Sequence, residues 1–596
     1  MVRHAIATLV SIAVASFLRA VPVLAEDPSP GTMDEGDEET DTDYWDGVEF
    51  GRDDFAEVRR FVKLFYIDPS FDKHMAWISA ANHALRTMDK PREMLPEDFW
   101  RRKRAANDPR VGADMVKVRK SDLFVIHEVP EKDPDRKSAP SMTPKEIRAK
   151  KAELRRRMEE RDKAFARMPF TEADFERVVE FVERHEKDLN PKFRLADVYV
   201  AAARGYLASL DPHSSIISAK AWDESTRNTT DGSFEGIGAV LTKKGEETII
   251  ETPMEGQPAF QAGLRAGDTI VAVDRKPVTG LELSKVVKRI RGPKGSQVVL
   301  TIRRLGEPKD IDFTLTRDSI EVRNVQSHML DRHPDVGYVK ITGFVPTTRE
   351  SMEGAIASLE KQAKGGRLRG LVLDLRNNSG GLLQESVEMA DDFLDSGVIV
   401  SVKDPTDRDE VYRAEPGGHR FPLVVLVNDS SASAAEILAS AIQENNRGLV
   451  VGERTFGKAS VQTLLNPLLR RDYYIKLTVA RYYAPSGRTI QVTGVIPDVE
   501  VPPALGEEPP VGFREEDLAH HLVRLSGEYP APNRDLVRKV SDCDRKMGVA
   551  DQIVRAEPSP QVKPDYQLLK AADYLECVIA AGGPAEPPVK AADRAR

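Results

Sequence analysis

Between residues 336 and 446, near-continuous apolar runs alternate with amphipathic segments. The runs are VGYVKITGF, LRGLVLDLRNNSGG and FPLVVLVND, and the segments that follow them are SMEGAIASLEKQAKG, LLQESVEMADDFL and SAAEILASAIQENN. Strands covered by helices on both faces show this pattern, because no face of the sheet needs polar residues. We therefore predict an α/β core over residues 318–504, with ligands bound at the carboxyl ends of its strands.

Helical periodicity marks the regions on both sides of this core. Residues 55–232 contain four such segments, beginning with DDFAEVRRFVKLFY, and Thr143 with Glu146 matches a capping box. Residues 505–582 contain the amphipathic stretch YQLLKAADYLECVIA. Neither region has a motif to which chemistry can be assigned. We predict two helical flanks, of which the C-terminal one packs on the core or forms an oligomer contact.

Shorter apolar runs and many glycines set residues 233–317 apart. Two strand patterns at 237–242 and 247–252 precede a short helix, PAFQAG, and the strand TIVAV. The loop Gly236, Ile237, Gly238 and Ala239 and the later segment AGLRAGDTIVAV resemble a PDZ domain of the bacterial type. That resemblance implies a peptide-binding strand whose first backbone N–H groups hold a terminal carboxylate. Alternatively, the GIGA segment is only a tight start of a strand.

The first 25 residues have the pattern of a signal peptide. Arg3 and His4 precede an apolar run from Ala5 to Leu18, and Val-Leu-Ala at 23–25 ends in a small residue. The alternative is an uncleaved membrane anchor. Both readings export the rest of the chain, so we expect the periplasm or another extracytoplasmic location, with membrane association if the segment is retained.

Composition adds three expectations. Residues 26–54 are acidic and poor in aliphatic side chains, which predicts a disordered leader, and residues 583–596 are expected to form a disordered tail. The whole chain has 596 residues with 40% hydrophobic and 31% charged residues, as expected for several soluble domains. Its net charge of -9 does not favour nucleic acid as a partner.

The sequence indicates no metal site, and it leaves open whether the cysteines form a disulfide. No HExxH sequence occurs, and we expect no metal and no organic cofactor. The two cysteines, Cys543 and Cys577, both belong to the exported part. An oxidising compartment permits a disulfide between them, but a chain of this size can fold without one, so free thiols are an equal alternative.

Two strand ends of the core carry unusual residues. Gly380 and Gly381 follow the strand LVLDL, where glycines allow backbone N–H groups to face an anion. The stretch SSASAAEILAS at 430–440 follows FPLVVLVND. A serine at a helix start is most often an N-cap, which is our reading of Ser430 and Ser431. Ser433 stands among alanines that leave room for a peptide, beside the N–H of Ala434 at the positive end of the helix.

A serine nucleophile needs a base, and lysine is the candidate. The histidines nearest in sequence, His419 and His520, stand in no site pattern, whereas Lys458 follows the strand GLVV in the loop GERTFGKASVQ. Bringing a lysine pKa from about 10.4 to near 7 corresponds to roughly 4 to 5 kcal/mol, which requires an enclosed site. Gln462, four residues further on, could fix the orientation of the amine.

These features together resemble the carboxyl-terminal processing peptidases, also called tail-specific proteases. The similarity rests on Ser433 and Lys458 at a spacing of 25, on GKASVQ and LDLRNNSGG, and on LTVARYYAPSGRTIQVTGVIPDVEV, and it extends from about Leu207 in LASLDPHS to Val501. It implies a crotonase/Clp-protease-like core, with Ser433 as nucleophile, Lys458 as general base and Gln462 orienting the lysine. The oxyanion hole would use backbone N–H groups of Gly380 or Gly381 and of Ala434.

Three residues depart from the family pattern. Ser379 replaces a usual proline, Ala459 a frequent glycine and Glu444 a common aspartate. None is a side chain of the implied dyad. An alanine at position 459 cannot adopt a positive φ without strain, unlike glycine. The backbone of the loop around Lys458 is therefore where the geometry could differ from the family.

The resemblance implies an exported serine endopeptidase that binds C-terminal tails through its PDZ domain and cleaves them. Its partners would be proteins or peptides with free, apolar C-termini, and an adaptor protein or a homo-oligomer is compatible with the sequence. The first alternative is a catalytically inactive PDZ scaffold that only binds tails. The second is a crotonase-like enzyme acting on acyl thioesters, against which export and the PDZ domain argue.

Overall fold

The chain forms two compact units in the computed structural model. The structure describes residues 44–129, 144–223, 233–506, 512–523, 534–556 and 564–581, with short gaps at 245–246, 255, 266, 282, 305–306, 308, 322–323, 407, 468–471 and 548. One unit is Asp223–Asn324, and the other comprises the residues before and after it. The expected signal peptide, residues 26–43 of the expected leader and the expected tail lie outside the described residues. No helix of the described residues is long and apolar enough to cross a membrane.

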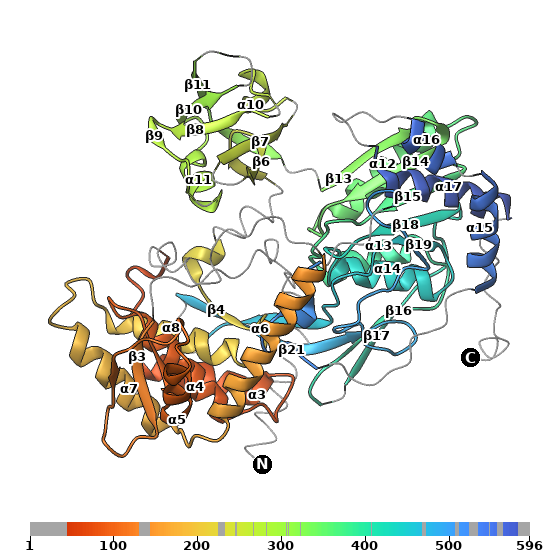
Figure 1. Cartoon of the computed structure of the whole chain (residues 1–596). Helices are drawn as coiled ribbons and strands as arrows, with labels where there is room; N and C mark the ends of the chain where they lie inside the picture. The colour runs from red at the N-terminus through yellow and green to blue at the C-terminus, as the bar shows by residue number, and fades with distance from the viewer. Residues whose placement is uncertain are drawn as a thin grey trace. The chain divides into compact units, whose positions relative to one another are not determined.

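A six-stranded sheet forms the centre of the larger unit (Figure 1). Its five parallel strands confirm the predicted α/β core, and only the edge strand β13 is antiparallel. On β15 the side chains of Leu371 and Leu373 face one hydrophobic cluster and Val372 faces another, so both faces are buried. The strands, in sheet order, are β13 (Val325–Leu330), β14 (His333–Ile341), β15 (Gly370–Asp374), β18 (Leu423–Val427), β19 (Leu449–Gly452) and β22 (Val499–Glu500).

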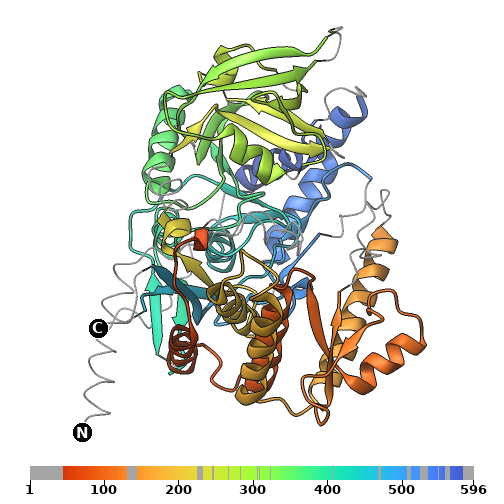
Figure 2. The same cartoon turned by 90° about the vertical axis from the view of Figure 1, so that its left-hand side faces the viewer.

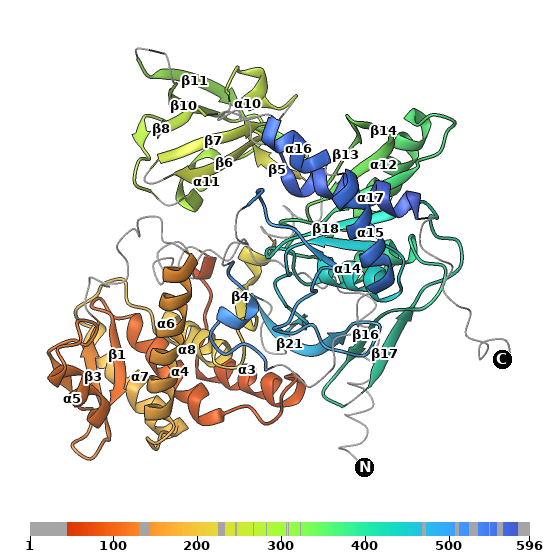
Figure 3. The same cartoon turned by 45° about the vertical axis from the view of Figure 1, so that its right-hand side comes forward.

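Helices cover both faces of this sheet. The first face packs on α12 (Thr348–Gln362), α13 (Leu383–Asp391) and α14 (Ala434–Glu444). The second packs on α17 (Tyr566–Ala580), which contacts β15, β18 and β19. Figure 3 shows α17 in dark blue with α15 (Arg534–Met547) and α16 (Val549–Ala556). The C-terminal flank is therefore helical and packs on the core, as one of the two predictions stated.

A disulfide links two of these C-terminal helices. The sulfur atoms of Cys543 in α15 and Cys577 in α17 are 2.05 Å apart. Of the two alternatives left open by the sequence, the structure has the disulfide.

A second sheet joins the N-terminal region to the core. It contains β17 (Asp409–Arg413), β16 (Val398–Lys403), β21 (Tyr473–Tyr483) and β20 (Ser460–Leu465), and β4 (Ser215–Ser218) pairs with β21. Since β4 precedes the inserted unit in sequence, the N-terminal region supplies a strand to a sheet built mainly by the core. Residues just before β4 also contact the core, since Asp211 accepts from the hydroxyl of Thr478 in β21 and Nε2 of His213 lies 3.1 Å from Oε1 of Glu515.

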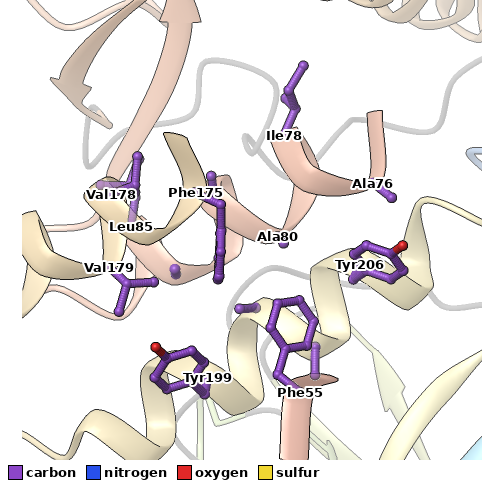
Figure 4. Close-up of a cluster of buried hydrophobic side chains, with 14 of the residues drawn as sticks. Phe55, Ala76, Ile78, Ala80, Leu85, Phe175, Val178, Val179, Tyr199 and Tyr206 are labelled. Atoms are coloured by element: carbon purple, nitrogen blue, oxygen red, sulfur yellow. The ribbon is translucent and has the colours of Figure 1, made fainter. Parts of the chain in front are cut away.

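The N-terminal region buries an aromatic core between its helices. Phe55, Phe175 and Tyr206 pack with alanines and valines of four helices, as Figure 4 shows. Figure 2 shows this region in red and orange on the lower side of the molecule. The helices are α3 (Arg52–Phe65), α4 (Lys73–Arg86), α5 (Glu97–Ala105), α6 (Pro144–Phe165), α7 (Glu172–Glu186) and α8 (Leu195–Ala208), of which α3, α4, α7 and α8 enclose the cluster of Figure 4.

Two predictions for this region need correction. It is not purely helical, because β1 (Arg92–Pro96), β3 (Phe124–Glu128) and β2 (Met115–Val116) form a three-stranded sheet. The leader does not extend to residue 54, because Trp45 and Phe50 are buried against the ring of Tyr473. The prediction relied on the acidic composition of residues 26–54 and gave no weight to these two aromatic residues. Their burial offsets the loss of conformational entropy when this part of the chain becomes ordered.

Among its described residues, the smaller unit is a sheet domain with two short helices. Its main strands follow the order β11 (Ile311–Thr316), β10 (Gln297–Arg303), β8 (Thr269–Val273), β7 (Glu247–Pro253) and β6 (Ala239–Lys244), and β9 (Lys276–Pro277) pairs with β8. The helices are α10 (Pro258–Gln261) and α11 (Leu283–Ile290). The unit is wider than the predicted 233–317, because β5 (Ser233–Gly236) pairs with β12 (Asp318–Glu321) and closes it.

Candidate active site

Three loops meet at the carboxyl ends of adjacent parallel strands. They are residues 375–382 after β15, 428–433 after β18 and 453–459 after β19. Their backbones are joined, since the N–H of Ala432 donates to the carbonyl of Asn378 at 2.9 Å and the N–H of Phe456 to that of Ser431 at 3.0 Å. The predicted nucleophile, base and oxyanion glycines all lie on these loops.

Ser433 is the residue immediately before α14, and its backbone is strained. Its φ of 55° and ψ of -116° lie where non-glycine residues rarely occur, at an order-of-magnitude cost of about 1–3 kcal/mol. The side chain is 8% exposed and lines a small cavity with Gly381, Leu383, Ala434, Ile437, Ser460, Val461, Gln462 and Tyr482. Our N-cap reading of Ser430 and Ser431 is wrong, because Ser433 holds that position and the hydroxyl of Ser431 donates to the carbonyl of Leu375.

Lys458 is enclosed as its expected role requires. It is 5% exposed and follows Gly457, whose φ of 98° allows the sharp turn after β19. The hydroxyl of Tyr482 donates to the carbonyls of both Lys458 and Ser433. Burial raises the pKa of Tyr482 well above its ordinary value, so this hydroxyl keeps its proton and acts as a donor.

The carboxylate of Glu436, on the first turn of α14, joins the nucleophile loop to the lysine loop. One oxygen, Oε2, accepts from the N–H of Ser433 at 2.8 Å and from the N–H of Lys458 at 3.0 Å. The other, Oε1, accepts from the hydroxyl of Thr455 and from the N–H of Gly457. Glu436 is fully buried, and this burial raises its pKa to about 7 even though the four donors favour the charged form.

The sequence interpretation missed Glu436, although a signal was present. Ser433 and Glu436 form the S-x-x-E pattern of a capping box, in which the glutamate returns to the N–H of the first residue. Because Ser433 was already the predicted nucleophile, this pattern could have identified Glu436 as the residue that fixes the backbone of Ser433.

The structure reduces the number of backbone N–H groups that could form the predicted oxyanion hole. The N–H of Gly380 donates to Oδ1 of Asn378 at 2.9 Å, so Gly380 is not a suitable donor. Among the described residues, the N–H groups of Gly381 and Ala434 donate to no acceptor, and both residues line the cavity beside Ser433. Gly380 has a steric role instead, because a Cβ there would lie 2.8 Å from Cβ of Ser433.

Gln462 lies in the same cavity and is 3% exposed. Its Nε2 donates to Oγ of Ser460 at 2.8 Å and to Oγ1 of Thr478 at 3.1 Å. The Thr478 hydroxyl donates in turn to Asp211 at 2.9 Å, which belongs to the N-terminal flank. These contacts fix the amide of Gln462, and its expected role in orienting Lys458 stays a prediction.

The three departures from the family pattern leave the site geometry intact. Ala459 does not have a positive φ, so the missing glycine causes no strain there, and its N–H donates to Oε1 of Gln491 at 2.8 Å. Glu444 forms a buried ion pair with Arg488 at 2.7 Å. Ser379 is exposed.

The predicted peptide-binding loop lies at the start of an edge strand. Gly236, Ile237 and Gly238 lead into Ala239, the first residue of β6, and α11 contacts β6. The side chain of Ile237 is buried in the core of this unit, so only its backbone can contact a peptide. Gly238 has a φ of 69°, and a Cβ there would lie 2.4 Å from Gln257, so no larger residue fits.

No group of three His, Cys, Asp or Glu side chains that could hold a metal occurs in the part of the chain that the structure describes.

Parts of this chain are similar to known proteins. Peptidase family S41 matches residues 335–501 and the PDZ domain family matches residues 249–304. A carboxy-terminal-processing protease of Bartonella bacilliformis is 38% identical over 328 residues, which cover 54% of this chain and 74% of the relative. The carboxy-terminal processing protease CtpA of Bacillus subtilis is 38% identical over 339 residues, with coverage of 55% and 69%.

Among solved structures, the photosystem II D1 C-terminal processing protease is 33% identical and covers 54% of this chain and 86% of its own, with a TM-score of 0.35. The sequence relatives decide the assignment. This chain belongs to the carboxy-terminal processing proteases, and it is a serine-type peptidase of family S41 with a PDZ domain.

Proposed function

We propose that this peptidase cleaves proteins near free C-termini with a Ser433/Lys458 dyad, after its PDZ domain has bound the tail. The observation that carries the dyad is the shared oxygen of Glu436, which binds the backbone N–H of the nucleophile and of the base at once. Such a link fixes the backbone of Ser433 relative to the backbone of Lys458, and acyl transfer requires the two reacting groups to be held in a defined geometry.

The proposed reaction uses the side chains and backbone donors of these loops. Oγ of Ser433 attacks the carbonyl carbon of the scissile peptide bond, and its proton passes to the neutral amine of Lys458. The N–H groups of Gly381 and Ala434 donate to the oxyanion that forms. When the C–N bond breaks, the ammonium of Lys458 returns the proton to the leaving amine. Water then attacks the acyl-enzyme and gives a proton to Lys458, and as the bond between Oγ of Ser433 and the acyl carbon breaks, Lys458 passes that proton to Oγ and the new C-terminus is released.

Tail capture is proposed for the edge strand of the smaller unit. β6 is at the end of its sheet, so an extended peptide can add to it as a further strand. The glycine-rich segment before β6 offers N–H groups to the terminal carboxylate, and α11, which contacts β6, carries the half-buried apolar side chains of Leu283 and Val287 for the last residues of the tail. Substrates with apolar C-termini are therefore expected.

The proposal includes an extracytoplasmic location and a crotonase/Clp-protease-like core. The location rests on the signal-like pattern of residues 1–25. The fold detail is supported by a glycine loop after a buried parallel strand, next to the nucleophile at a helix start. Adaptor binding and self-association are compatible additions to this proposal.

The decisive experiment compares the chain from Glu26 onward with Ser433→Ala and Lys458→Ala. The substrate is a peptide with an apolar C-terminus, offered as free acid and as amide. Cleavage of the acid that both substitutions abolish supports the dyad, and a spared amide supports carboxylate capture. Tight binding of the acid without cleavage by the unaltered chain would support the inactive PDZ scaffold. Turnover of acyl thioesters but not of peptides would support the crotonase-like alternative.

A further inference from the structure

A short segment after the catalytic core is bonded to the backbone of the lysine loop. These residues, 512–518, are called the strap below. Nη1 of Arg514 donates to the carbonyl of Thr455 at 2.6 Å, and the N–H of Glu515 donates to the carbonyl of Phe456 at 3.3 Å. Both carbonyls belong to the loop after β19 that carries the proposed base. The strap therefore holds this loop just before the base.

The strap also reaches the lysine loop on the other side of Lys458. Nε2 of Gln491 donates to Oε1 of Glu515 at 2.8 Å, and the carbonyl oxygen of the same amide accepts from the N–H of Ala459 at 2.8 Å. Glu515 is fully buried, and Nε2 of His213 lies 2.9 Å from its Oε2. A buried carboxylate is costly without such partners, so these contacts fix Glu515 in its place.

The outer side of the strap is held by α6 of the N-terminal flank. Nζ of Lys151 lies 2.6 Å from the carbonyl oxygen of Gly512 and 2.6 Å from Oδ2 of Asp517. The same Oδ2 accepts from the N–H of Arg514 at 3.0 Å. One carboxylate oxygen thus joins α6 to the residue whose side chain holds the lysine loop.

The strap packs on the nucleophile loop as well. A Cβ at Gly512 would lie 1.8 Å from Oδ2 of Asp429, so no side chain fits at this position. Asp429 belongs to the loop after β18 that ends at Ser433. The strap is therefore in contact with two of the three loops that meet at the site.

The carbonyl that Arg514 holds belongs to a residue that supports Glu436. The hydroxyl of Thr455, which is fully buried, donates to Oε1 of Glu436. Oε2 of Glu436 accepts from the N–H groups of Ser433 and Lys458 at 2.8 and 3.0 Å. A displacement of Thr455 would therefore reach both residues of the dyad through one carboxylate.

We propose that Arg514 is a positioning residue of the Ser433/Lys458 dyad, and that the strap makes the N-terminal flank part of the support of the active site. This inference rests on the proposed dyad and deepens it. A guanidinium forms a charge-assisted hydrogen bond, which is stronger than a neutral one. A shift of about 1 Å at a catalytic group can cost on the order of 100-fold in rate. Arg514 acts through Thr455 and takes no part in the proton transfer.

The first test measures kcat, KM and Tm of Arg514→Met on the peptide substrate. We expect kcat to fall about tenfold and KM to stay within about twofold, because the strap supports the dyad and not the tail-binding strand β6. Arg514→Lys should restore part of kcat, since an ammonium can donate to the same carbonyl. An unchanged kcat, or a rise in KM as large as the fall in kcat, would overturn the inference.

Two changes in α6 complete this test. Arg155→Met is the matched control, because Nη2 of Arg155 donates to the carbonyl of Glu516 at 3.2 Å on the exposed side of the strap. It should leave kcat within about twofold, and a loss equal to that of Arg514→Met would count against a specific role of Arg514. Lys151→Met removes the buried link to Gly512 and Asp517 and should lower kcat about threefold. An unaltered kcat in Lys151→Met would refute the role of the N-terminal flank.

A second measurement needs no substrate. Hydrogen–deuterium exchange of the full chain reports on the N–H groups of Gly457 and Lys458, which Glu436 binds. Arg514→Met should speed exchange in peptides covering residues 453–459 about tenfold or more and leave peptides of β15 unchanged. Faster exchange throughout the sheet would indicate a general loss of stability, and faster exchange in the strap alone would separate it from the lysine loop.

Either of those two exchange results would overturn the inference. The exchange measurement also separates this inference from the proposed function. If Ser433→Ala or Lys458→Ala retains activity, the dyad fails, whereas the exchange of residues 453–459 still decides whether Arg514 fixes the loop.

Discussion

The two helical flanks hold opposite sides of the active site by different means. The N-terminal flank reaches the lysine side through a buried hydrogen-bond network, in which Asp211 binds Thr478 and Thr478 accepts from Gln462. The C-terminal flank reaches the proposed oxyanion side through charges. Asp565, at the start of α17, pairs with Arg376 in the loop that carries Gly380 and Gly381. Residues with no catalytic motif of their own thus fix the loops that carry the motifs.

The two connections differ in burial, which determines how strongly each should respond to mutation. Asp211 is fully buried, whereas the side chain of Asp565 is 45% exposed and its pair with Arg376 is partly screened by water. Arg376 also pairs with the fully buried Asp374, so this arginine couples a weak outer contact to a strong inner one.

The largest effect is expected from Arg376→Met. Among the described residues, this change leaves the buried carboxylate of Asp374 with the hydroxyl of Tyr338 as its one remaining side-chain donor, and breaking such a pair costs about 3–5 kcal/mol. We expect kcat/KM to fall about 100-fold through displacement of the glycine loop, together with a lower Tm. Asp565→Asn, at the exposed end of the same network, should cost less than fivefold, and Arg367→Met serves as an exposed control. Equal losses for Arg376→Met and Asp565→Asn would show that the outer contact, not the buried one, controls the loop.

Asp211→Asn should have the next largest effect. Asp211 accepts from the N–H groups of His213 and Ser214 and from the hydroxyls of Ser214 and Thr478, at 2.7 to 3.0 Å. An amide nitrogen would face some of these donors, at a cost of about 1–3 kcal/mol. We expect kcat to fall about tenfold because Gln462 loses its fixed orientation, with Asp188→Asn as an exposed control. An unaltered kcat at a lowered Tm would restrict this network to stability.

The smallest effect on catalysis is expected from removing the disulfide. Replacing Cys543 and Cys577 by serine opens a closed loop with a sequence separation of 34, for which the chain-entropy model gives a loss of roughly 3–4 kcal/mol. Because α17 still packs on the sheet through Leu575 and its apolar neighbours, kcat/KM at 25 °C should change less than twofold while Tm falls. The measurement compares kcat/KM and Tm of the double variant with those of the oxidised wild-type chain, and the reduced wild-type chain serves as the control that should match the variant. A large loss of activity without a loss of Tm would contradict this prediction. It would show that the position of α15, and not only the Asp565–Arg376 pair, affects the glycine loop.

The sequence carried the parts of this picture that depend on local pattern. The apolar runs predicted β15 and β18, and the spacing of Ser433 and Lys458 located the loops after β18 and β19. The connections between flanks and loops were not predictable, because pairs such as His213 with Glu515 are 302 residues apart and follow no motif. The strands β1 to β3 were missed because REMLP and FVIHE are short and lie between strongly helical segments.

The pairing of β5 with β12 has a consequence for how the protein can be rearranged. Their register places Ser233 opposite Glu321 and Gly236 opposite Asp318, so the PDZ unit is entered and left by neighbouring strands. When the two ends of an inserted domain lie side by side, the domain can be removed and its place taken by a short loop that joins the same two points of the remaining chain. The unit can thus be treated as an exchangeable cassette. A tail-binding domain of another specificity, joined through the same two strands, would redirect the peptidase without altering Ser433 or Lys458.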